Sequence, residues 1–270
     1  MPERYAVMGN PIAHSQSPRI HALFARQTGE DLVYNRILVP TDGFAAAVAE
    51  FEAAGARGLN ITVPFKLEAW NVVDRRTARA ERAGAVNTIA MTRAGRLGDN
   101  TDGTGLVRDL CDNHGVELYD RRILVLGAGG AVRGVLPALL AETAAEVVLA
   151  NRTRERAEAI AAALADLGKV TVCNPAEIAN ERFDLVINGT SAGLRGEIPA
   201  LPEDLHIGGA TAYDMVYGEA SAAFCRWALE HGAARALDGL GMLVEQAAES
   251  FLLWRGIRPQ TATVIQALRG

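Results

Sequence analysis

The sequence lacks most features that mark secreted, membrane-spanning or nucleic-acid-binding proteins. It has only three cysteines in 270 residues, an odd number at distant positions without metal-ligand spacing: Cys111, Cys173 and Cys225. No apolar run reaches the ~18 residues that a membrane span needs, and the first residues lack the profile of a signal peptide. The net charge of −5 argues against a broad nucleic-acid surface. We therefore expect a cytoplasmic protein with reduced thiols, no metal site, and neither a nucleic-acid nor a membrane partner.

The composition is that of a globular protein. Apolar residues make up 49% of the chain and charged residues 22%, and we find no internal repeat or low-complexity segment. At 270 residues, the chain can form one large domain or two modest ones, each able to bury its own core.

In the first block of the chain, short strands alternate with helices, which predicts a mostly parallel sheet. The expected strands are residues 5–8, 35–39, 58–63 and 86–92, and helices are expected from about residue 17, over 43–54 and up to residue 70. Ser17 is expected to cap the first helix, with Pro18 at its first position. A turn rich in Gly, Asn, Asp and Thr, at residues 100–105, closes this block.

The second block repeats the alternation and ends in a long helix. Its expected strands are residues 123–126, 147–150, 183–187 and 211–215. The helical segment 241–254 has no strand partner, so we expect it to return to the first block. The sequence thus predicts an α/β protein with one domain over residues 1–102, completed by 240–270, and another over 103–239.

The segment from Arg122 to Thr153 carries the strongest single motif. An apolar run ends at a glycine turn, a helical stretch follows, and a second apolar run ends at Asn151. Strand, glycine turn, helix and strand form the βαβ unit that binds a dinucleotide, with the pyrophosphate over the helix N-terminus. NAD-binding proteins usually place Asp or Glu after the second strand to accept a bond from the ribose 2′-hydroxyl. Here Asn151 is followed by arginines, which attract a 2′-phosphate, so the pattern predicts NADP.

Two features leave competing interpretations for this motif. Val132 stands where the usual fingerprint has its third glycine, and a tight turn in an ordinary α/β protein would also use these glycines. Arg154 and Arg156 alternate with Glu155 and Glu158, as they would on a solvated helix face.

Five further segments, read in order, resemble the shikimate dehydrogenase family over almost the whole chain. They are GNPIAHSQSP (9–18), NITVPFK (60–66), GAVNT (84–88), GDNTDG (98–103) and DGLGMLVEQA (238–247). The resemblance implies reversible NADPH-dependent reduction of 3-dehydroshikimate to shikimate, a step of aromatic amino-acid and chorismate biosynthesis. It also implies a substrate domain, a Rossmann-like NADP domain, and an active site in the cleft between them.

The resemblance implies substrate contacts from short polar side chains, which suit a small ring with hydroxyls and one carboxylate. Two serines would hold the carboxylate, and amide, carboxylate and hydroxyl groups would contact the ring. The implied substrate residues are Ser15, Ser17, Thr62, Asn87, Asp102, Tyr217 and Gln246.

Lys66 is the expected acid/base, paired with Asp102, because hydride addition to a ketone leaves an alkoxide that must gain a proton. Taken alone, each residue has a plainer interpretation: an exposed lysine at a helix start, and an aspartate that closes a turn. The order and density of the matching segments favour the catalytic one.

For the cofactor, the resemblance implies contacts from the glycine turn, the second strand end and two later loops. The implied residues are Gly127, Ala128, Gly129, Gly130, Ala131, Asn151, Arg152, Thr153, Arg156, Met215 and Gly239. The chain departs from the family pattern at Ala78, where an acidic residue is common, at Gly189, where alanine is usual, and at residues 219–224.

The sequence leaves two other functions open. A quinate/shikimate dehydrogenase would also accept quinate or NAD, although Asn151 disfavours NAD. A non-catalytic nucleotide sensor would have no need for Lys66 and Asp102. The sequence is compatible with a monomer or a homodimer.

Overall fold

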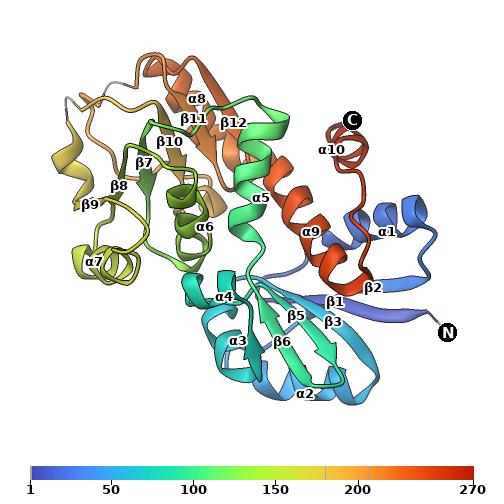
Figure 1. Ribbon diagram of the computed structural model, residues 1–270. Coiled ribbons are helices and arrows are strands. Elements are labelled where there is room, and N and C mark those ends of the chain that lie inside the picture. The colour runs from blue at the N-terminus through green and yellow to red at the C-terminus, as the bar shows by residue number, and fades with distance from the viewer. Residues whose placement is uncertain (1, 180, 206) are drawn as a thin grey trace. The chain divides into compact units, whose positions relative to one another are not determined.

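The computed structural model describes residues 2–179, 181–205 and 207–270, and the chain forms two compact units (Figure 1). Unit 1 comprises Met1–Gly105 and Leu243–Gly270, and unit 2 comprises Leu106–Met242. The chain passes from one unit to the other within two helices, α5 (Asp102–Arg108) and α9 (Leu240–Arg255).

Unit 1 is built on a mixed sheet with the strand order β2-β1-β3-β5-β6-β4. Strands β1 and β2, β1 and β3, and β4 and β6 pair in parallel, whereas β5 pairs antiparallel with both of its neighbours. The elements of the N-terminal part are β1 (Glu3–Gly9), α1 (Ser17–Thr28), β2 (Leu32–Leu38), α2 (Phe44–Ala53), β3 (Ala56–Ile61), α3 (Lys66–Val72), β4 (Arg75–Arg76), α4 (Ala78–Ala83), β5 (Thr88–Thr92) and β6 (Gly95–Asp99).

The hairpin of β5 and β6 is the main difference from the predicted sheet of unit 1. Its turn is closed by the Thr92 hydroxyl, which donates to the Gly95 carbonyl at 2.6 Å, and Gly95 has a φ of +95°. Strand β6 reads Gly-Arg-Leu-Gly-Asp, with one large apolar residue, so it carries no alternating signal. Backbone pairing with β5, and not side-chain pattern, makes this segment a strand.

Helices cover both faces of the unit 1 sheet, because alternate residues of each strand point to opposite sides. Ala6 and Met8 of β1 pack with Phe44 of α2 in one cluster, and Tyr5 and Val7 contribute to another on the opposite face. A third cluster joins α1, α9 and α10 (Ala262–Arg269). The C-terminal part of α9 therefore belongs to unit 1.

The start of α1 differs from the prediction that Ser17 caps it. The cap position is Gln16, without a side-chain cap bond, and Ser17 is already the first helical residue, followed by Pro18. The Ser17 amide is satisfied instead by the Ser15 hydroxyl, at 3.3 Å. This local bond leaves the Ser17 hydroxyl available for other partners.

Unit 2 has a parallel sheet with the order β12-β11-β10-β7-β8-β9, the arrangement of a dinucleotide-binding fold. Its elements are the π-helix η1 (Asp109–Asn113), β7 (Arg122–Leu126), α6 (Gly130–Ala141), β8 (Glu146–Ala150), α7 (Arg154–Ala163), β9 (Val170–Cys173), η2 (Pro175–Ile178), β10 (Leu185–Asn188), η3 (Gly193–Arg195), β11 (Thr211–Asp214), η4 (Gly218–Ser221), α8 (Ala222–Glu230) and β12 (Arg235–Asp238).

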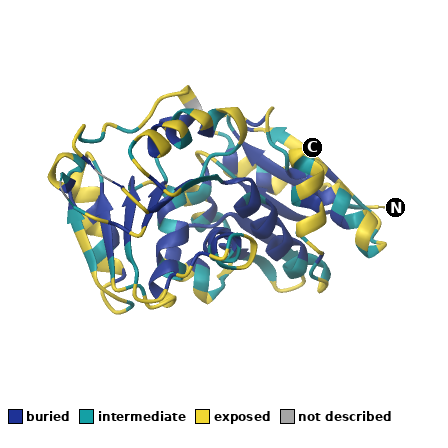
Figure 2. Ribbon diagram, turned by 90° about the horizontal axis from the view of Figure 1, so that it is seen from above, coloured by how far each residue is buried: buried dark blue, intermediate teal, exposed yellow. Residues whose placement is uncertain are grey.

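The four central strands of unit 2, β7, β8, β10 and β11, are buried on both sides (Figure 2), as expected for a parallel sheet covered by helices. Ile123 and Val125 of β7 pack against α6 and α7, and Leu124 and Leu126 pack on the α8 side with Phe224. Strand order reverses at β7, whose neighbours are β8 and β10. Ligands of such sheets bind at this switch point, beyond the carboxyl ends of the strands.

Within the described ranges, every helix falls short of the length and apolar character that a membrane crossing requires.

Candidate active site

Lys66 and Asp102 form a close ion pair in unit 1. Lys66 begins α3, Asp102 begins α5, and Lys66 Nζ lies 2.5 Å from Asp102 Oδ2. The two side chains are 16% and 6% exposed, so the pair is largely shielded while the ammonium keeps some access to solvent. A shielded amine beside a carboxylate can donate or accept a proton at a fixed position.

The Asn87 amide fixes the second oxygen of Asp102. Asn87 Nδ2 donates to Asp102 Oδ1 at 2.8 Å and to Thr101 Oγ1 at 2.9 Å. Asn87 Oδ1 accepts from the Thr101 amide and from the Thr88 hydroxyl, both at 2.9 Å. Both ends of this buried amide are therefore engaged, which sets its orientation and, through it, the plane of the carboxylate.

A buried polar cluster behind Asn87 includes residues that were not predicted as site residues. Asn60 Nδ2 donates to Ser250 Oγ at 2.9 Å and to Thr88 Oγ1 at 3.1 Å. Asn60 interrupts an apolar strand and Ser250 lies one turn after Gln246 in an apolar helix. A polar residue at a position where the pattern demands an apolar one is the signal that could have identified them.

Gln246 joins this cluster from α9. Its Oε1 lies 3.4 Å from Asn87 Nδ2 and from Thr101 Oγ1, and its Nε2 donates to the Leu243 carbonyl at 2.7 Å. Four of the predicted residues, Lys66, Asn87, Asp102 and Gln246, thus form one hydrogen-bonded group.

Ser15, at the end of the loop after β1, and Ser17, the first residue of α1, lie together. Their hydroxyl oxygens are 3.2 Å apart, within hydrogen-bond distance. The loop is tied to the segment that carries Thr62, because the Asn10 amide donates to the Val63 carbonyl at 2.9 Å. Gly9 permits this approach, since a Cβ there would lie 2.4 Å from the Thr62 methyl group.

Tyr34 and His21 form a buried pair of stacked rings in unit 1. Burial raises the pKa of Tyr34 well above its usual range, although a hydrogen bond with Ser17 opposes the shift, so the hydroxyl stays protonated and donates to Asn60 Oδ1 at 2.7 Å. His21 stacks on Tyr34 with ring centroids 4.2 Å apart. Burial lowers the pKa of His21 to about 3, so this ring is neutral at physiological pH.

In unit 2, the glycine turn after β7 leaves room for a ligand. Gly127 has a φ of +103°, and a Cβ there would lie 3.1 Å from the Gly189 carbonyl oxygen. Gly129 caps α6, and no atom lies within 4 Å of the position that its Cβ would take. The turn residues Gly127, Ala128, Gly129, Gly130 and Ala131 therefore present a helix N-terminus with open space in front, which fits a pyrophosphate.

The arginines after β8 differ in whether they form ion pairs within the protein. Arg154 donates to Glu158 (3.0 Å), to Glu177 (3.2 Å) and to the Val172 carbonyl (3.3 Å), as on a solvated helix face. Among the described residues, no carboxylate lies within ion-pair distance of Arg152 or Arg156, and both are exposed. These two guanidinium groups, next to Asn151 and Thr153, fit a 2′-phosphate.

The loop after β10 is held by a buried carboxylate. Asn188 Nδ2 donates to Asp214 Oδ2 at 3.2 Å, and Asn188 Oδ1 accepts from the Thr190 amide and hydroxyl. Burial raises the pKa of Asp214 to about 6. Met215 and Gly239 lie next to each other beyond this point, because a Cβ on Gly239 would be 2.5 Å from the Met215 carbonyl oxygen.

Tyr217 belongs to unit 2, where it precedes η4, whereas the other predicted substrate residues belong to unit 1. At Ala78, the first residue of α4, the structure offers no acidic group, and the neighbouring Arg79 anchors this helix instead. Its Nη2 and Nε donate to the buried Asp99 carboxylate at 2.6 and 2.7 Å.

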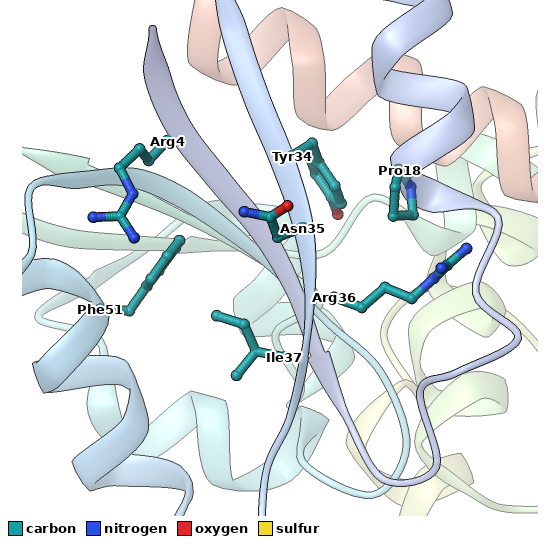
Figure 3. A pocket seen from close by; sticks show the side chains of 7 residues that line it. All are labelled: Arg4, Pro18, Tyr34, Asn35, Arg36, Ile37 and Phe51. Atoms are coloured by element: carbon teal, nitrogen blue, oxygen red, sulfur yellow. The ribbon is translucent and has the colours of Figure 1, made fainter. Parts of the chain in front are cut away.

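A pocket of unit 1 lies along β2 (Figure 3). It is lined by Arg4, Pro18, Tyr34, Asn35, Arg36, Ile37 and Phe51. None of the predicted site residues lines it, so we do not assign the reaction to it.

Three family models match successive parts of the chain. The model of the shikimate dehydrogenase substrate binding domain matches residues 7–89, that of shikimate / quinate 5-dehydrogenase matches residues 109–195, and that of the shikimate 5′-dehydrogenase C-terminal domain matches residues 239–269.

Similar proteins match over the full length. The NADP(+) shikimate dehydrogenase of Alkalilimnicola ehrlichii is 64% identical over 270 residues, which cover 100% of this chain and 99% of that protein. That of Thioalkalivibrio sulfidiphilus is 56% identical, covering 99% and 98%. The crystal structure of Thermus thermophilus shikimate 5-dehydrogenase with NADP(H) and shikimate has a TM-score of 0.88 at 35% identity, covering 99% of this chain and 98% of that one. With the ordered motifs, the Lys66–Asp102 pair and this full-length similarity, the chain belongs to the shikimate dehydrogenase family.

Proposed function

We propose that this protein catalyses the reversible reduction of 3-dehydroshikimate to shikimate with NADPH, in the shikimate pathway. Unit 1 is the proposed substrate domain and unit 2 the proposed NADP domain. The observation that carries the proposal is the shielded Lys66–Asp102 pair, 2.5 Å apart, inside a shell of hydroxyl and amide groups. Full-length relatives that carry the name NADP(+) shikimate dehydrogenase support it.

The chain's own residues can hold NADP in unit 2. The α6 N-terminus and Gly129 face open space for the pyrophosphate, and Arg152 and Arg156 carry charges without a protein counter-ion among the described residues. Met215 and Gly239, which are adjacent, would lie near the nicotinamide. When bound, NADPH supplies the hydride.

Lys66 is the proposed catalytic acid in the direction of reduction. Hydride addition to the carbonyl carbon leaves a negative charge on the carbonyl oxygen, and the Lys66 ammonium donates a proton to that oxygen. In the reverse direction the neutral amine removes the hydroxyl proton. Asp102 accepts a hydrogen bond from Lys66 throughout, and so orients the amine and balances its charge.

The remaining substrate contacts follow from the residue types. Ser15 and Ser17 would donate to the carboxylate, and Asn87, Asp102 and Gln246 would contact the ring hydroxyls. Thr62 adds a further short polar side chain, and Tyr217 would lie at the mouth of the site. The three cysteines are free thiols, which supports a reducing compartment such as the cytoplasm.

The test is a four-way rate comparison of the purified protein, with shikimate or quinate as substrate and NADP or NAD as cofactor, followed at 340 nm. We expect the rate with shikimate and NADP to exceed the other three by at least tenfold. Similar rates with quinate or NAD would favour the dual-specificity enzyme. Folded protein without activity on any pair would contradict the proposal and favour a nucleotide-binding role.

A further inference from the structure

The Arg36 side chain holds the segment that carries the two serines. Its Nε and Nη2 both donate to the Ser15 carbonyl oxygen, at 2.8 and 2.5 Å. The Ser15 amide donates to the Ile12 carbonyl at 3.1 Å, and the Ser15 hydroxyl accepts from the Ser17 amide. Because both main-chain polar groups of Ser15 are engaged, Arg36 helps to set where the Ser15 hydroxyl points.

Strand β2 supports the second serine as well. Residues two apart on a strand face the same side, and Figure 3 shows Tyr34 and Arg36 on the side of Pro18, with Asn35 and Ile37 on the other. The Tyr34 hydroxyl, which donates to Asn60 Oδ1, adjoins Ser17, whose side chain opposes the rise in the pKa of Tyr34. One edge strand therefore reaches both serine positions: Arg36 holds the Ser15 carbonyl, and Tyr34 adjoins Ser17.

Arg36 also brings a charge that the two hydroxyls lack. Hydroxyl groups are neutral donors, whereas a bound carboxylate is a full negative charge that loses water on binding. In the part of the chain that the structure describes, no carboxylate lies within ion-pair distance of Arg36. Its positive charge is thus not neutralised by the protein and can act on an anion held by Ser15.

We infer that Arg36 is a positioning and specificity-determining residue for carboxylate-bearing substrates: it fixes the Ser15 hydroxyl and places a positive charge behind the carboxylate subsite. This inference rests on the proposed function, which assigns that subsite to Ser15 and Ser17. Arg36 acts through Ser15, and hydride and proton transfer do not involve it.

Arg4 provides a matched control from the same pocket. It donates to the Ala54 carbonyl at 3.0 Å and its guanidinium lies over the Phe51 ring, 5.6 Å from the centroid. Figure 3 shows it beside Phe51, at the opposite end of the pocket from Arg36. Loss of Arg4 removes one exposed positive charge from unit 1 without touching Ser15.

The experiment compares wild type, Arg36→Met, Arg36→Lys and Arg4→Met, with shikimate and with its uncharged methyl ester. For Arg36→Met we expect KM for shikimate to rise five- to tenfold with kcat within twofold, and KM for the ester to rise less than twofold. Arg36→Lys keeps the charge and loses the two-donor contact, so its KM should lie between. Arg4→Met should match wild type. Where the ester reacts too slowly, its inhibition constant against shikimate replaces its KM.

An equal rise for ester and acid would show that Arg36 is merely structural, and an unchanged KM for shikimate would remove it from the subsite; either result overturns the inference. If Arg36→Met does not fold, the salt dependence of the wild-type protein provides the test. KM for shikimate should rise several-fold between 20 and 300 mM salt, because added salt screens an exposed charge, while KM for the ester should stay constant. Wild type without activity on shikimate would instead refute the proposed function.

Discussion

The Val132 side chain fills the space that a side chain at Gly189 would need. A single added methyl group, in Gly189→Ala, should therefore lower the stability of the protein markedly. A Cβ on Gly189 would lie 2.4 Å from Val132 Cγ2, closer than any real contact, and 3.1 Å from Met215 Sδ. Val132 is fully buried in the first turn of α6, within the core that packs on β7 and β10. The backbone of Gly189 does not have a positive φ, so the Gly189→Ala cost comes from packing alone.

The magnitudes follow from the two packing terms. Overpacking a close-packed core costs about 1–3 kcal/mol, so Gly189→Ala should destabilise unit 2 by about 2 kcal/mol. Val132→Ala removes two buried methyl groups, at about 0.8 kcal/mol each plus a cavity term, again about 2 kcal/mol. In the double variant the new methyl group enters the space that Val132 vacates. We therefore expect it to lose only about 1–2 kcal/mol instead of the additive 4, the remainder arising from the Leu126 carbonyl, 3.3 Å from the new methyl group.

The assay is urea unfolding of wild type, both single variants and the double variant, monitored by circular dichroism. The coupling energy of the resulting cycle should be about 2–3 kcal/mol. An additive double variant, or a Gly189→Ala protein as stable as wild type, would refute the reasoning. A large coupling energy would also explain two departures from the family pattern together. Val132, in place of the third glycine, adds the volume that Gly189, in place of alanine, leaves free.

Three further predictions concern catalysis, cofactor and pH. Lys66→Arg should keep the ion pair with Asp102 but lower kcat at least 100-fold, because a guanidinium does not release its proton. The control is Lys169→Arg, at the only other lysine of the sequence. A normal kcat in Lys66→Arg would exclude Lys66 from the chemistry. Arg152→Ala should raise KM for NADP about tenfold and leave KM for NAD unchanged, whereas Arg154→Ala, whose guanidinium is already paired, should change neither more than twofold. Because burial lowers the pKa of His21 from 6.5 to about 3, the folded state binds fewer protons than the unfolded state, and stability falls as pH drops below 6.5. We expect a loss of about 2 kcal/mol between pH 7 and 5 that His21→Phe abolishes; an equal loss in the variant would contradict the assignment.

The sequence patterns predicted most elements but not the whole sheet of unit 1. Apolar runs predicted the strands β1, β3 and β7. The helix α2 was predicted within one residue of its observed bounds, Phe44–Ala53. Strand β6 was missed because its identity depends on pairing with β5 and not on its own side chains. The cap of α1 was assigned to Ser17 from residue type, while the Ser15 hydroxyl, two residues earlier, satisfies the amide.

In the active site, too, local motifs predicted some residues and only tertiary contacts revealed others. The predicted Lys66, Asn87, Asp102 and Gln246 form one group, and each lies in a motif that could be read locally. Asn60 and Ser250, 190 residues apart, meet in the cluster behind them. The local pattern marks each of them as a polar residue in an apolar element, but it does not tell which distant residue each one meets.

By itself, the sequence determined the chemistry that is available: a lysine and an aspartate in ordered motifs, paired serines, a glycine turn after a strand, and arginines in place of an acidic residue. These depend on residue type and short spacing, which the chain carries locally. Only the tertiary structure decided which of these groups already have partners within the protein. It pairs Arg154 with Glu177 but leaves Arg152 without an ion pair among the described residues, and it binds Arg36 to the Ser15 carbonyl. It also places Val132 where a side chain at Gly189 would lie. Those outcomes depend on contacts between distant segments, whose energies exist only once the sheets and helices have packed.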